Sequence, residues 1–452
     1  MPYSEIRLST HAFVPKAEIT TPLSKLRQSF TIVSKFEPDV SVQIYEETET
    51  SFGYPMHYTD FALHTKNLID NRCEGEHIDF SMCEGFELRD NQKPFIEDFL
   101  HTCANGKTGW LLNLGTGMGK TVLCCRMLQE LGRTALVIVP RQHLVKQWME
   151  RILEFTNLTQ NDIGIAQQDV CEYEGKKIVV GMVHSLSKDK YNEGFKNHFG
   201  VVVWDECHSM AAQTSSQTLS MFPAKYRIGM SATMNRKDNL QDAYKLSIGQ
   251  VMLAPEHITT LVHPKVFLFA YKPAKKNSYL AKMSDAKARR GKLISELAND
   301  AARNNLISAY AKKFADSGRR VVVFSDRVEQ LKNLREFLTI KRGMRLSEVG
   351  LFTGSTKAGD RKIILENSQI ILATYGVMAM GIDVPDLRAV IFGTPLSDVA
   401  QSVGRILRLC EGTKDPVVLD IVDTAYFDCT RWAAMRQQYY NETANAKLYE
   451  LK

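Results

Sequence analysis

Long apolar runs are missing from this chain of 452 residues. No stretch approaches the roughly 20 apolar residues that span a bilayer, and the first residues lack the apolar core of a secretion signal. The nine cysteines have neither the spacing of a zinc site nor that of a disulfide framework. No repeat of solenoid period is present. These absences argue against a membrane, secreted or solenoid protein and favour a cytoplasmic protein with reduced thiols.

Charge is distributed unevenly, although the net charge is only +6. Residues 1–84 contain 7 basic and 13 acidic side chains, whereas residues 272–345 contain 19 basic and 7 acidic ones. A basic stretch of this kind suits a polyanionic partner such as nucleic acid. A solvated, lysine-rich face is the alternative that composition leaves open.

Two short segments have the residues that handle a nucleoside triphosphate. LGTGMGKT, residues 114–121, is a glycine-rich loop whose backbone N–H groups point at phosphates while Lys120 reaches the terminal ones. VVVWDECH, residues 201–208, is an apolar strand that ends in Asp205 and Glu206, one suited to hold Mg²⁺ and the other to activate a water. A glycine run alone is more often a plain turn. The pair predicts a nucleoside triphosphate hydrolase.

The pattern of apolar residues divides the chain into blocks. We expect a small α+β accessory module over residues 1–84, an ATP-binding α/β domain over 85–250, a joining segment over 251–300 and a second α/β domain over 301–452. Buried strands are predicted at residues 134–140, 178–182, 201–204, 226–230, 321–325, 369–373, 389–392 and 417–421. Two such blocks in series predict two tandem, doubly wound parallel sheets.

With these motifs the chain resembles the superfamily-two helicases, in which two RecA-like domains close on ATP. The motifs follow the family's order over residues 86–408. The resemblance implies that Gln92, with Arg89 beside it, reads adenine, since an amide offers both a donor and an acceptor. It implies Mg²⁺ ligands at Thr121 and Asp205, with Glu206 as the base. It also implies phosphate contacts from Gly115, Thr116, Gly117, Met118, Gly119 and Lys120, although Leu114 stands where the general pattern has its first glycine.

Further motifs extend the resemblance. His208 would couple hydrolysis to the second domain, and Arg405 and Arg408 in QSVGRILR would be arginine fingers that neutralise charge on the transferring phosphoryl group. The implied remaining nucleotide contacts are Gly381, Asp383 and Gln401, and the implied nucleic-acid contacts are Pro140, Arg141, Ser231, Thr233, Gly354 and Thr374. A plain turn around Gly354 and surface arginines on a helix are the structural alternatives. Residues 236–238 resemble the Arg-acid-Asp element of XPB-type helicases, with Lys237 in place of the acid.

The spacing, the N-terminal module and ATYGVMAMGIDVP, residues 373–385, look most like phage helicases of the UvsW type, with XPB and RecG as more distant relatives. That resemblance implies an ATP-driven DNA helicase that remodels forks and junctions in recombination, repair or replication, with residues 1–84 as its DNA-recognition module. A phage origin would place it in the host cytoplasm. We expect a monomer, although no residue pattern fixes the oligomeric state. Two alternatives stay open: an RNA-dependent ATPase, against which Cys207 stands in place of alanine, and the motor subunit of a restriction or nucleic-acid-sensing complex. Polarity, preferred junction, oligomeric state and the strand-separating element are not identified.

Overall fold

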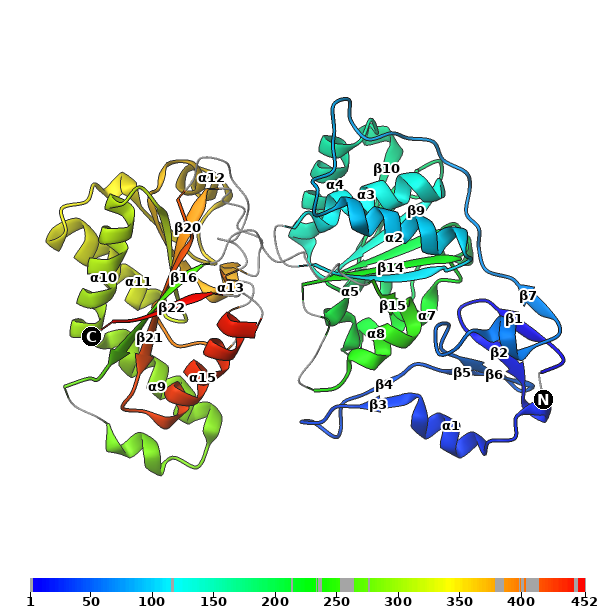
Figure 1. The fold of residues 1–452 in the computed structure, drawn as a ribbon, viewed down its shortest axis with the longest axis horizontal. Helices are drawn as coiled ribbons and strands as arrows, with labels where there is room; N and C mark the ends of the chain where they lie inside the picture. The colour runs from blue at the N-terminus through cyan, green and yellow to red at the C-terminus, as the bar shows by residue number, and fades with distance from the viewer. Residues whose placement is uncertain are drawn as a thin grey trace. The chain divides into compact units, whose positions relative to one another are not determined.

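The computed structural model describes residues 3–114, 118–212, 214–232, 234, 238–252, 264–274, 277–378, 386–397, 399, 402–403, 414–442 and 446–451. The chain divides into two compact units, Met1–Ile258 and Thr259–Lys452. Each unit is built around a parallel sheet with helices on both faces (Figure 1).

The first 84 residues form the small α+β module that the sequence predicts. Its five-stranded sheet has the order β5-β6-β2-β1-β7, and β3 and β4 form a separate hairpin. The elements are β1 (Ile6–Leu8), β2 (Ala12–Pro15), η1 (Lys16–Glu18), α1 (Leu23–Ser29), β3 (Thr31–Val33), β4 (Ser41–Gln43), β5 (Glu46–Glu47), β6 (Ser51–Tyr54), η2 (Phe61–His64) and β7 (Leu68–Asp70). Edge-to-face contacts among Phe30, Phe52 and Tyr54 fill its core.

This module is packed into the domain that follows it. The backbone N–H of His57 donates to the carbonyl of Leu246 at 2.8 Å, and that of Cys73 donates to the carbonyl of Pro223 at 2.6 Å. The fully buried Arg227 donates to the carbonyl of Thr10 at 3.3 Å as well as to carbonyls of its own domain. One continuous apolar core runs through both parts. Residues 1–84 therefore belong to the same compact unit as the first RecA-like domain.

The first RecA-like sheet has eight strands among the described residues, in the order β11-β10-β12-β9-β13-β14-β8-β15. They are β8 (Gly109–Asn113), β9 (Ala135–Val139), β10 (Ile163–Gln167), β11 (Val170–Cys171), β12 (Ile178–Met182), β13 (Val201–Asp205), β14 (Tyr226–Ser231) and β15 (Gln250–Val251). Among the described residues, all pairings in this sheet are parallel except that of β10 with β11. The strands are almost continuously apolar because helices cover both faces of the sheet.

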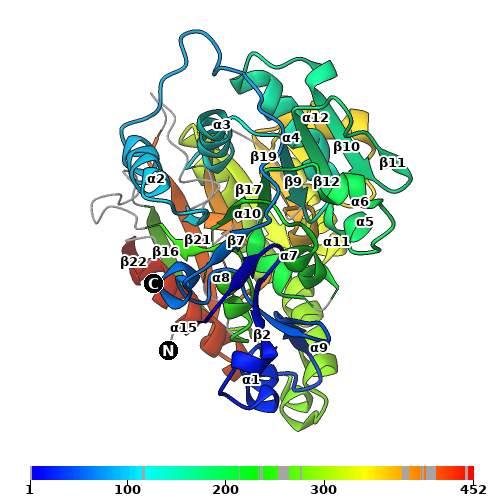
Figure 2. The ribbon, with the colours of Figure 1, turned by 90° about the vertical axis from the view of Figure 1, so that its right-hand side faces the viewer.

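Two sets of helices cover this sheet. The set on one face is α2 (Lys93–Ala104), α3 (Lys120–Leu131) and α4 (Gln142–Phe155), and the set on the other is α5 (Val183–Leu186), α7 (Thr218–Met221) and α8 (Gln241–Ile248). The remaining short elements are α6 (Glu193–Lys196), η3 (Gln160–Asp162), η4 (Cys207–Ala211) and η5 (Ser215–Gln217). Both views place α1 of the N-terminal module at the end of the unit opposite to α3 and α4 (Figures 1 and 2).

The second unit contains a seven-stranded parallel sheet in its described part, in the order β18-β19-β17-β20-β21-β16-β22. Its strands are β16 (Lys265–Tyr271), β17 (Arg320–Ser325), β18 (Val349–Phe352), β19 (Ile370–Thr374), β20 (Leu387–Phe392), β21 (Val417–Asp423) and β22 (Lys447–Leu451). Its helices are α9 (Ala286–Asn299), α10 (Ala301–Asp316), α11 (Val328–Glu336), α12 (Ala358–Asn367), α13 (Tyr375–Met378) and α15 (Phe427–Glu442), with η6 (Ser278–Lys282), η7 (Phe337–Lys341) and η8 (Leu346–Glu348).

All eight strands predicted from the sequence are present, and the two RecA-like parallel sheets are confirmed. The joining segment differs from the expectation. Residues 251–300 contribute β16 to the second sheet, between β21 and β22, and α9 packs against α15 of the same unit. The apolar run of β16, whose residues Val266 and Leu268 are buried, precedes the charged, helix-prone part of the segment on which the expectation was based. No helix in the described ranges combines the length and hydropathy needed to cross a bilayer.

Candidate nucleoside triphosphate site

The strand order of the first sheet brings the predicted motifs to one edge. Strands β9, β13, β14 and β8 are consecutive neighbours and run parallel, so their carboxyl ends meet at the same edge of the sheet. There the chain presents Pro140 after β9, Asp205 at the end of β13, Ser231 at the end of β14 and Leu114 after β8. This is the edge at which open parallel sheets bind ligands.

Lys120 is the first residue of α3 and faces the acids of β13. Its Nζ donates to the carbonyl of Leu114 at 3.3 Å and lies 3.9 Å from Oε1 of Glu206. The preceding Gly119 has a φ of +85°, and a Cβ at that position would lie 2.1 Å from Nε2 of Gln92. Glycine is therefore required there both by its backbone conformation and by the neighbouring amide. A helix that begins in this way directs free N–H groups and a positive charge to the same place, which suits a phosphate.

Asp205 is half-buried at the end of β13, and its two carboxylate oxygens are held by the protein. Oδ2 accepts the indole N–H of Trp148 at 2.8 Å, and Oδ1 accepts the backbone N–H of Glu206 at 3.0 Å. Burial, and then the negative charge of Glu206, raise the pKa of Asp205 to about 6, against the opposing effects of Trp148 and Lys120. A carboxylate that is oriented and short of solvation is a good ligand for a small divalent cation.

The donor set around Asp205 fits Mg²⁺. Mg²⁺ prefers oxygen ligands and takes one or two carboxylates together with substrate phosphates, so a dense cluster of protein ligands is not required. Within the described residues no group of three or more His, Cys, Asp or Glu side chains forms such a cluster. Thr121 follows Lys120 in the first turn of α3 and supplies a second oxygen donor. Thr121 and Asp205 are thus the residues that would hold the ion.

Glu206 has a backbone conformation that few residues of its type adopt. Its φ and ψ are both +50°, in the left-handed region. Such strain in a residue other than glycine costs free energy and is characteristic of functional sites. The conformation turns the chain sharply after β13. The side chain of Glu206 then lies between Lys120 and His208, with His208 Nδ1 at 3.3 Å from Glu206 Oε2.

His208 connects this acid to the next strand. Its Nδ1 is 2.8 Å from Oγ of Ser231, which is the last residue of β14. Ser231 is fully buried. Lys120, Glu206, His208 and Ser231 therefore form a continuous polar line across the ends of β8, β13 and β14. The backbone N–H of Leu114 donates to the carbonyl of Ser231 at 3.1 Å, which ties the start of the glycine-rich loop to the same serine.

Gln92 is almost completely buried and bridges two segments. Its Oε1 accepts the backbone N–H of Arg89 at 3.0 Å, and its Nε2 donates to the carbonyl of Met118 at 3.1 Å. An amide has two N–H donors and two lone pairs, so these bonds use half of its capacity. Gln92 thus helps to fix the glycine-rich loop, a contact that the sequence alone did not indicate.

Several predicted site residues lie outside the described residues. They are Gly115, Thr116, Gly117, Thr233, Gly381, Asp383, Gln401, Arg405 and Arg408, together with Arg236 and Lys237. Their assigned roles stay predictions.

The predicted nucleic-acid contacts that the structure describes lie at strand ends in both units. In the first unit Arg141 is exposed and precedes α4 directly. In the second unit Thr374 ends β19, and Gly354 lies in the turn after β18. Within that turn the hydroxyl of Thr356 accepts the backbone N–H of Thr353 at 2.9 Å, so this amide is engaged by the turn itself. A Cβ on Gly354 would meet no atom within 4 Å, so the outer side of the turn is open.

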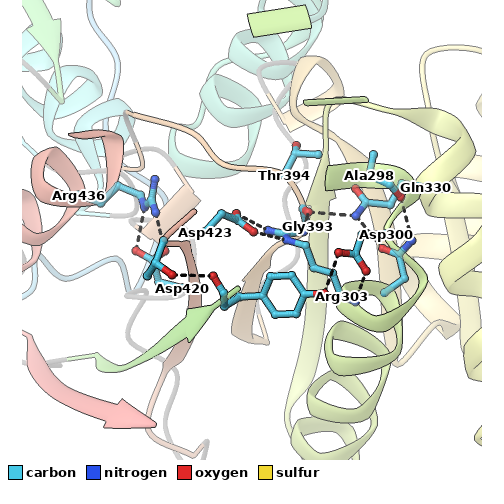
Figure 3. A network of polar contacts seen from close by, with 12 residues as sticks. Ala298, Asp300, Arg303, Gln330, Gly393, Thr394, Asp420, Asp423 and Arg436 are labelled. Atoms are coloured by element: carbon cyan, nitrogen blue, oxygen red, sulfur yellow. Dashed lines mark hydrogen bonds and ion pairs between the residues drawn. The ribbon is translucent and has the colours of Figure 1, made fainter. Parts of the chain in front are cut away.

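Two buried arginine–aspartate pairs organise the second unit (Figure 3). Arg303 pairs with Asp423 at 2.8 and 3.1 Å, and Arg436 pairs with Asp420 at 2.8 and 2.7 Å. Arg303 also donates to the carbonyl of Gly393, and Arg436 to the carbonyl of Leu396. The two pairs thereby fix the start of the segment that leads from β20 toward Gln401.

Sequence reasoning missed Trp148 and the two buried pairs. Trp148 fell on the apolar side of a helical pattern, and only the need of a buried indole N–H for an acceptor could have marked it. Arg303 was counted with the basic stretch at 272–345, but it is fully buried and paired with Asp423. Spacing alone does not reveal that partner, which is 120 positions away in the chain.

Family models cover both α/β blocks in succession. The model described as "Type III restriction enzyme, res subunit" matches residues 85–236, and the one described as "Helicase conserved C-terminal domain" matches residues 302–410. The chain belongs to the superfamily-two helicases. It is therefore an ATP-hydrolysing helicase.

Relatives and solved structures agree with this family. The chain is 28% identical over 411 residues to a putative ATP-dependent RNA helicase L396 of Acanthamoeba polyphaga mimivirus, covering 90% of this chain and 78% of that protein. It is 24% identical to a DNA 3'-5' translocase XPB2 of Sulfurisphaera tokodaii, over 74% of this chain and 81% of that protein. A structure of Dbp5 from S. cerevisiae matches with a TM-score of 0.55 at 17% identity, covering 80% of this chain and 89% of that one, which shows a shared fold.

Proposed function

We propose that this helicase uses ATP and Mg²⁺ to translocate on DNA and to unwind or branch-migrate forks and junctions, in recombination, repair or replication. The observation that best supports ATP-driven translocation is the line of polar contacts from Lys120 through Glu206 and His208 to Ser231. It connects the residue expected to touch phosphate with the strand end expected to respond to nucleic acid. A structural salt-bridge cluster would not need the strained backbone of Glu206.

The proposed roles in hydrolysis follow from these contacts. Lys120 and the N-terminus of α3 bind the phosphates, and Mg²⁺, when bound at Thr121 and Asp205, neutralises charge on them. Glu206 accepts a proton from the attacking water. Its carboxylate is suited to this role because it is 3.9 Å from Nζ of Lys120, which binds the phosphates. Gln92 and Arg89 are proposed to contact the adenine, and Arg405 and Arg408 to stabilise charge on the transferring phosphoryl group.

The change on hydrolysis is proposed to pass through His208. Loss of the terminal phosphate alters the charge beside Glu206, whose Oε2 is 3.3 Å from Nδ1 of His208. The same nitrogen is 2.8 Å from the hydroxyl of Ser231, so the orientation of the imidazole depends on both Glu206 and Ser231. Ser231 ends β14, and the residues after it carry the proposed nucleic-acid contact Thr233. His208 is thus a positioning residue between the two sites.

Charge on the second unit supports a nucleic-acid partner. The exposed side of α9 carries Lys287, Arg290 and Lys292. Lys292 lies over the exposed ring of Tyr279 at 5.2 Å, so one accessible aromatic ring accompanies the charges, whereas the ring of Trp432 beneath Arg290 at 5.1 Å is buried. Basic side chains interleaved with rings are typical of single-strand binding surfaces. Each phosphate contact releases counterions, so binding should weaken steeply with salt.

The preference for DNA and for branched substrates rests on the UvsW-type resemblance and on the N-terminal module. Its mixed, mainly acidic charge argues against broad phosphate binding by that module and favours a contact that depends on shape. An RNA helicase is the second candidate, favoured by the name of the mimivirus relative. A restriction motor is the third, favoured by the description of the first family model.

One assay separates the DNA candidates from the RNA candidate. ATP turnover is measured with four-way junction DNA, single-stranded DNA and single-stranded RNA at matched nucleotide concentration and salt. We expect the strongest stimulation with the junction, followed by single-stranded DNA. Stimulation by RNA that equals or exceeds both would overturn the DNA assignment while leaving the ATPase site intact. Full turnover without any nucleic acid would argue against a coupled motor.

A further inference from the structure

The hairpin formed by β3 and β4 carries an exposed aromatic ring at its tip. The strands pair antiparallel with Thr31 opposite Gln43 and Val33 opposite Ser41, and the hairpin extends away from the five-stranded sheet of its module (Figure 1). At the tip, the side chain of Phe36 is 64% exposed. The base of the hairpin is firmly anchored, because Phe30 and Val42 are buried in the core of the module.

The tip has a defined backbone. The N–H of Ser34 donates to the carbonyl of Val40 at 2.9 Å and closes the turn. The buried hydroxyl of Ser34 then accepts the backbone N–H groups of Phe36 at 3.3 Å and Glu37 at 3.2 Å. These bonds hold the backbone of Phe36 in place while its ring stays in solvent. A single exposed apolar residue is ordinary, but one at the end of a braced projection is positioned for contact.

The tip is also attached to the motor domain, at a residue of the segment that follows β14. The backbone N–H of Lys35 donates to the carbonyl of Asp238 at 3.0 Å. Asp238 lies seven positions after Ser231, the serine that contacts His208. Between them, the buried Met234 is held through its carbonyl by the hydroxyl of Tyr244 at 2.8 Å. The segment after β14 is therefore fixed at Ser231 near His208, at Met234, and at Asp238 against the hairpin.

The chemistry of the tip favours bases over phosphates. The exposed Lys35 precedes the ring and the exposed Glu37 and Asp39 follow it, so the tip has no net positive charge with which to bind a phosphate backbone. An aromatic ring stacks on the face of any base, without sequence preference. We propose that Phe36 is a base-stacking residue that caps the base pair at the end of a duplex while the motor opens it. This inference rests on the proposed helicase function and names the element that separates the strands.

The coupling follows from the same contacts. Because Lys35 binds the carbonyl of Asp238, a displacement of Asp238 during the ATP cycle would move the tip. The ring would then stack on an end pair in one nucleotide state and release it in another. A simple protein-interaction role for Phe36 would need no such attachment to the motor.

Four variants of the full chain test this. Phe36→Ala removes the ring, Phe36→Leu keeps apolar bulk without a π-face, and Phe36→Trp keeps a stacking face. Leu63→Ala is the matched control, since Leu63 is 77% exposed in the same module but lies on η2. Each is assayed for ATP turnover on single-stranded DNA, for unwinding of a synthetic fork, and for the fluorescence of 2-aminopurine placed in the first base pair of the fork.

We expect Phe36→Ala and Phe36→Leu to unwind the fork roughly 5- to 150-fold more slowly, the range produced by loss of one aromatic–base stack. Their turnover on single-stranded DNA and the salt dependence of binding should be unchanged, and the 2-aminopurine signal should no longer respond. Phe36→Trp and Leu63→Ala should behave as the wild-type chain does.

Wild-type unwinding by Phe36→Ala, or equal activity of Phe36→Leu and Phe36→Trp, would overturn the stacking role while leaving the helicase function in place. An equal defect in Leu63→Ala would show that any apolar change to the module has this effect, and would also overturn it. A wild-type chain that hydrolyses ATP yet opens no DNA fork would overturn the proposed function, and this inference with it.

Discussion

Replacing Trp148 with phenylalanine should weaken the proposed metal site without removing any of its ligands. The indole N–H of Trp148 donates to Oδ2 of Asp205 at 2.8 Å, and the ring is buried. Phenylalanine keeps an aromatic ring but has no donor. A hydrogen bond to a charged group contributes about 1.5–3 kcal/mol. Loss of a group that orients a metal ligand typically costs about 10–100-fold in metal affinity or activity, which is about 1.4–2.8 kcal/mol. The two estimates agree.

The assay is ATP turnover as a function of Mg²⁺ concentration, on single-stranded DNA. For Trp148→Phe we expect the Mg²⁺ concentration for half-maximal activity to rise by about 10–100-fold, with turnover partly restored at saturating Mg²⁺. The control is Trp110→Phe. Trp110 is equally buried, and its indole N–H donates to the hydroxyl of Thr102 at 2.9 Å, away from the acids. It should lose stability of about 1 kcal/mol with no change in the Mg²⁺ response.

The outcome that would refute this reasoning is a Trp148→Phe chain with the wild-type Mg²⁺ response. The same conclusion would follow if both tryptophan variants shifted that response equally. Either result would mean that the bond to Asp205 serves the fold alone. Thermal unfolding of both variants must be measured alongside, because both lose packing as well as a hydrogen bond.

Three further predictions follow from the two sites and from the first unit. Glu206→Gln should retain Mg–ATP but stall hydrolysis, because an amide cannot accept the proton of the water; an equal loss of nucleotide affinity would assign Glu206 to metal binding or to the fold instead. Arg405→Ala and Arg408→Ala should each lower turnover by roughly 10³-fold or more with little change in ATP affinity, and normal turnover in either would make that arginine a surface charge. Burial, and then the nearby charge of Arg227, lower the pKa of His57 to about 3. Between pH 6.5 and pH 3 a proton therefore binds His57 in the unfolded chain but not in the folded one. The free energy of unfolding falls as the pH falls through that window. His57→Gln should therefore reduce the difference in unfolding free energy between pH 7 and pH 5 by about 2 kcal/mol in urea titrations, and an unchanged difference would contradict the buried neutral state.

The sequence was sufficient for the two RecA-like parallel sheets, whereas the residues of the nucleotide site stay predictions. Strands such as β9 and β13 are continuous apolar runs, so the parallel sheet could be predicted from them directly. The positions of Lys120, Asp205 and Glu206 follow from local motifs, since each motif is short and its geometry is set within a few residues. Their common edge of the sheet is a finding of the structure, because the strand order makes β13, β14 and β8 neighbours and parallel neighbours end on the same side.

The contacts that could not be predicted from the sequence join residues that are far apart in the chain. Trp148 meets Asp205 across 57 positions, and Arg303 meets Asp423 across 120. Neither pair has a fixed spacing that a motif could encode. The same holds for the attachment of Lys35 to Asp238, which makes the hairpin part of the motor domain. Charge counting was misleading for Arg303, because a basic residue in a basic stretch can still be buried.

Integration of the N-terminal module changes how its role should be tested. A truncation near Cys83 would remove the partners of Leu246, Pro223 and Arg227 and would expose a shared core. Loss of activity in such a truncated chain would then report on stability. Single substitutions at exposed positions such as Phe36 avoid this difficulty, because they leave the contacts with the motor domain in place.

The central claim is that ATP turnover at the edge of the first sheet drives the remodelling of branched DNA. The most direct test is the conversion of a synthetic four-way junction into two duplex products, by the wild-type chain and by Lys120→Ala, with ATP and with no nucleotide. We predict conversion by the wild-type chain with ATP only, and none by Lys120→Ala, which should still fold and bind the junction. A junction left intact by a wild-type chain that unwinds an RNA duplex with ATP, or one converted equally well by Lys120→Ala, would contradict the account.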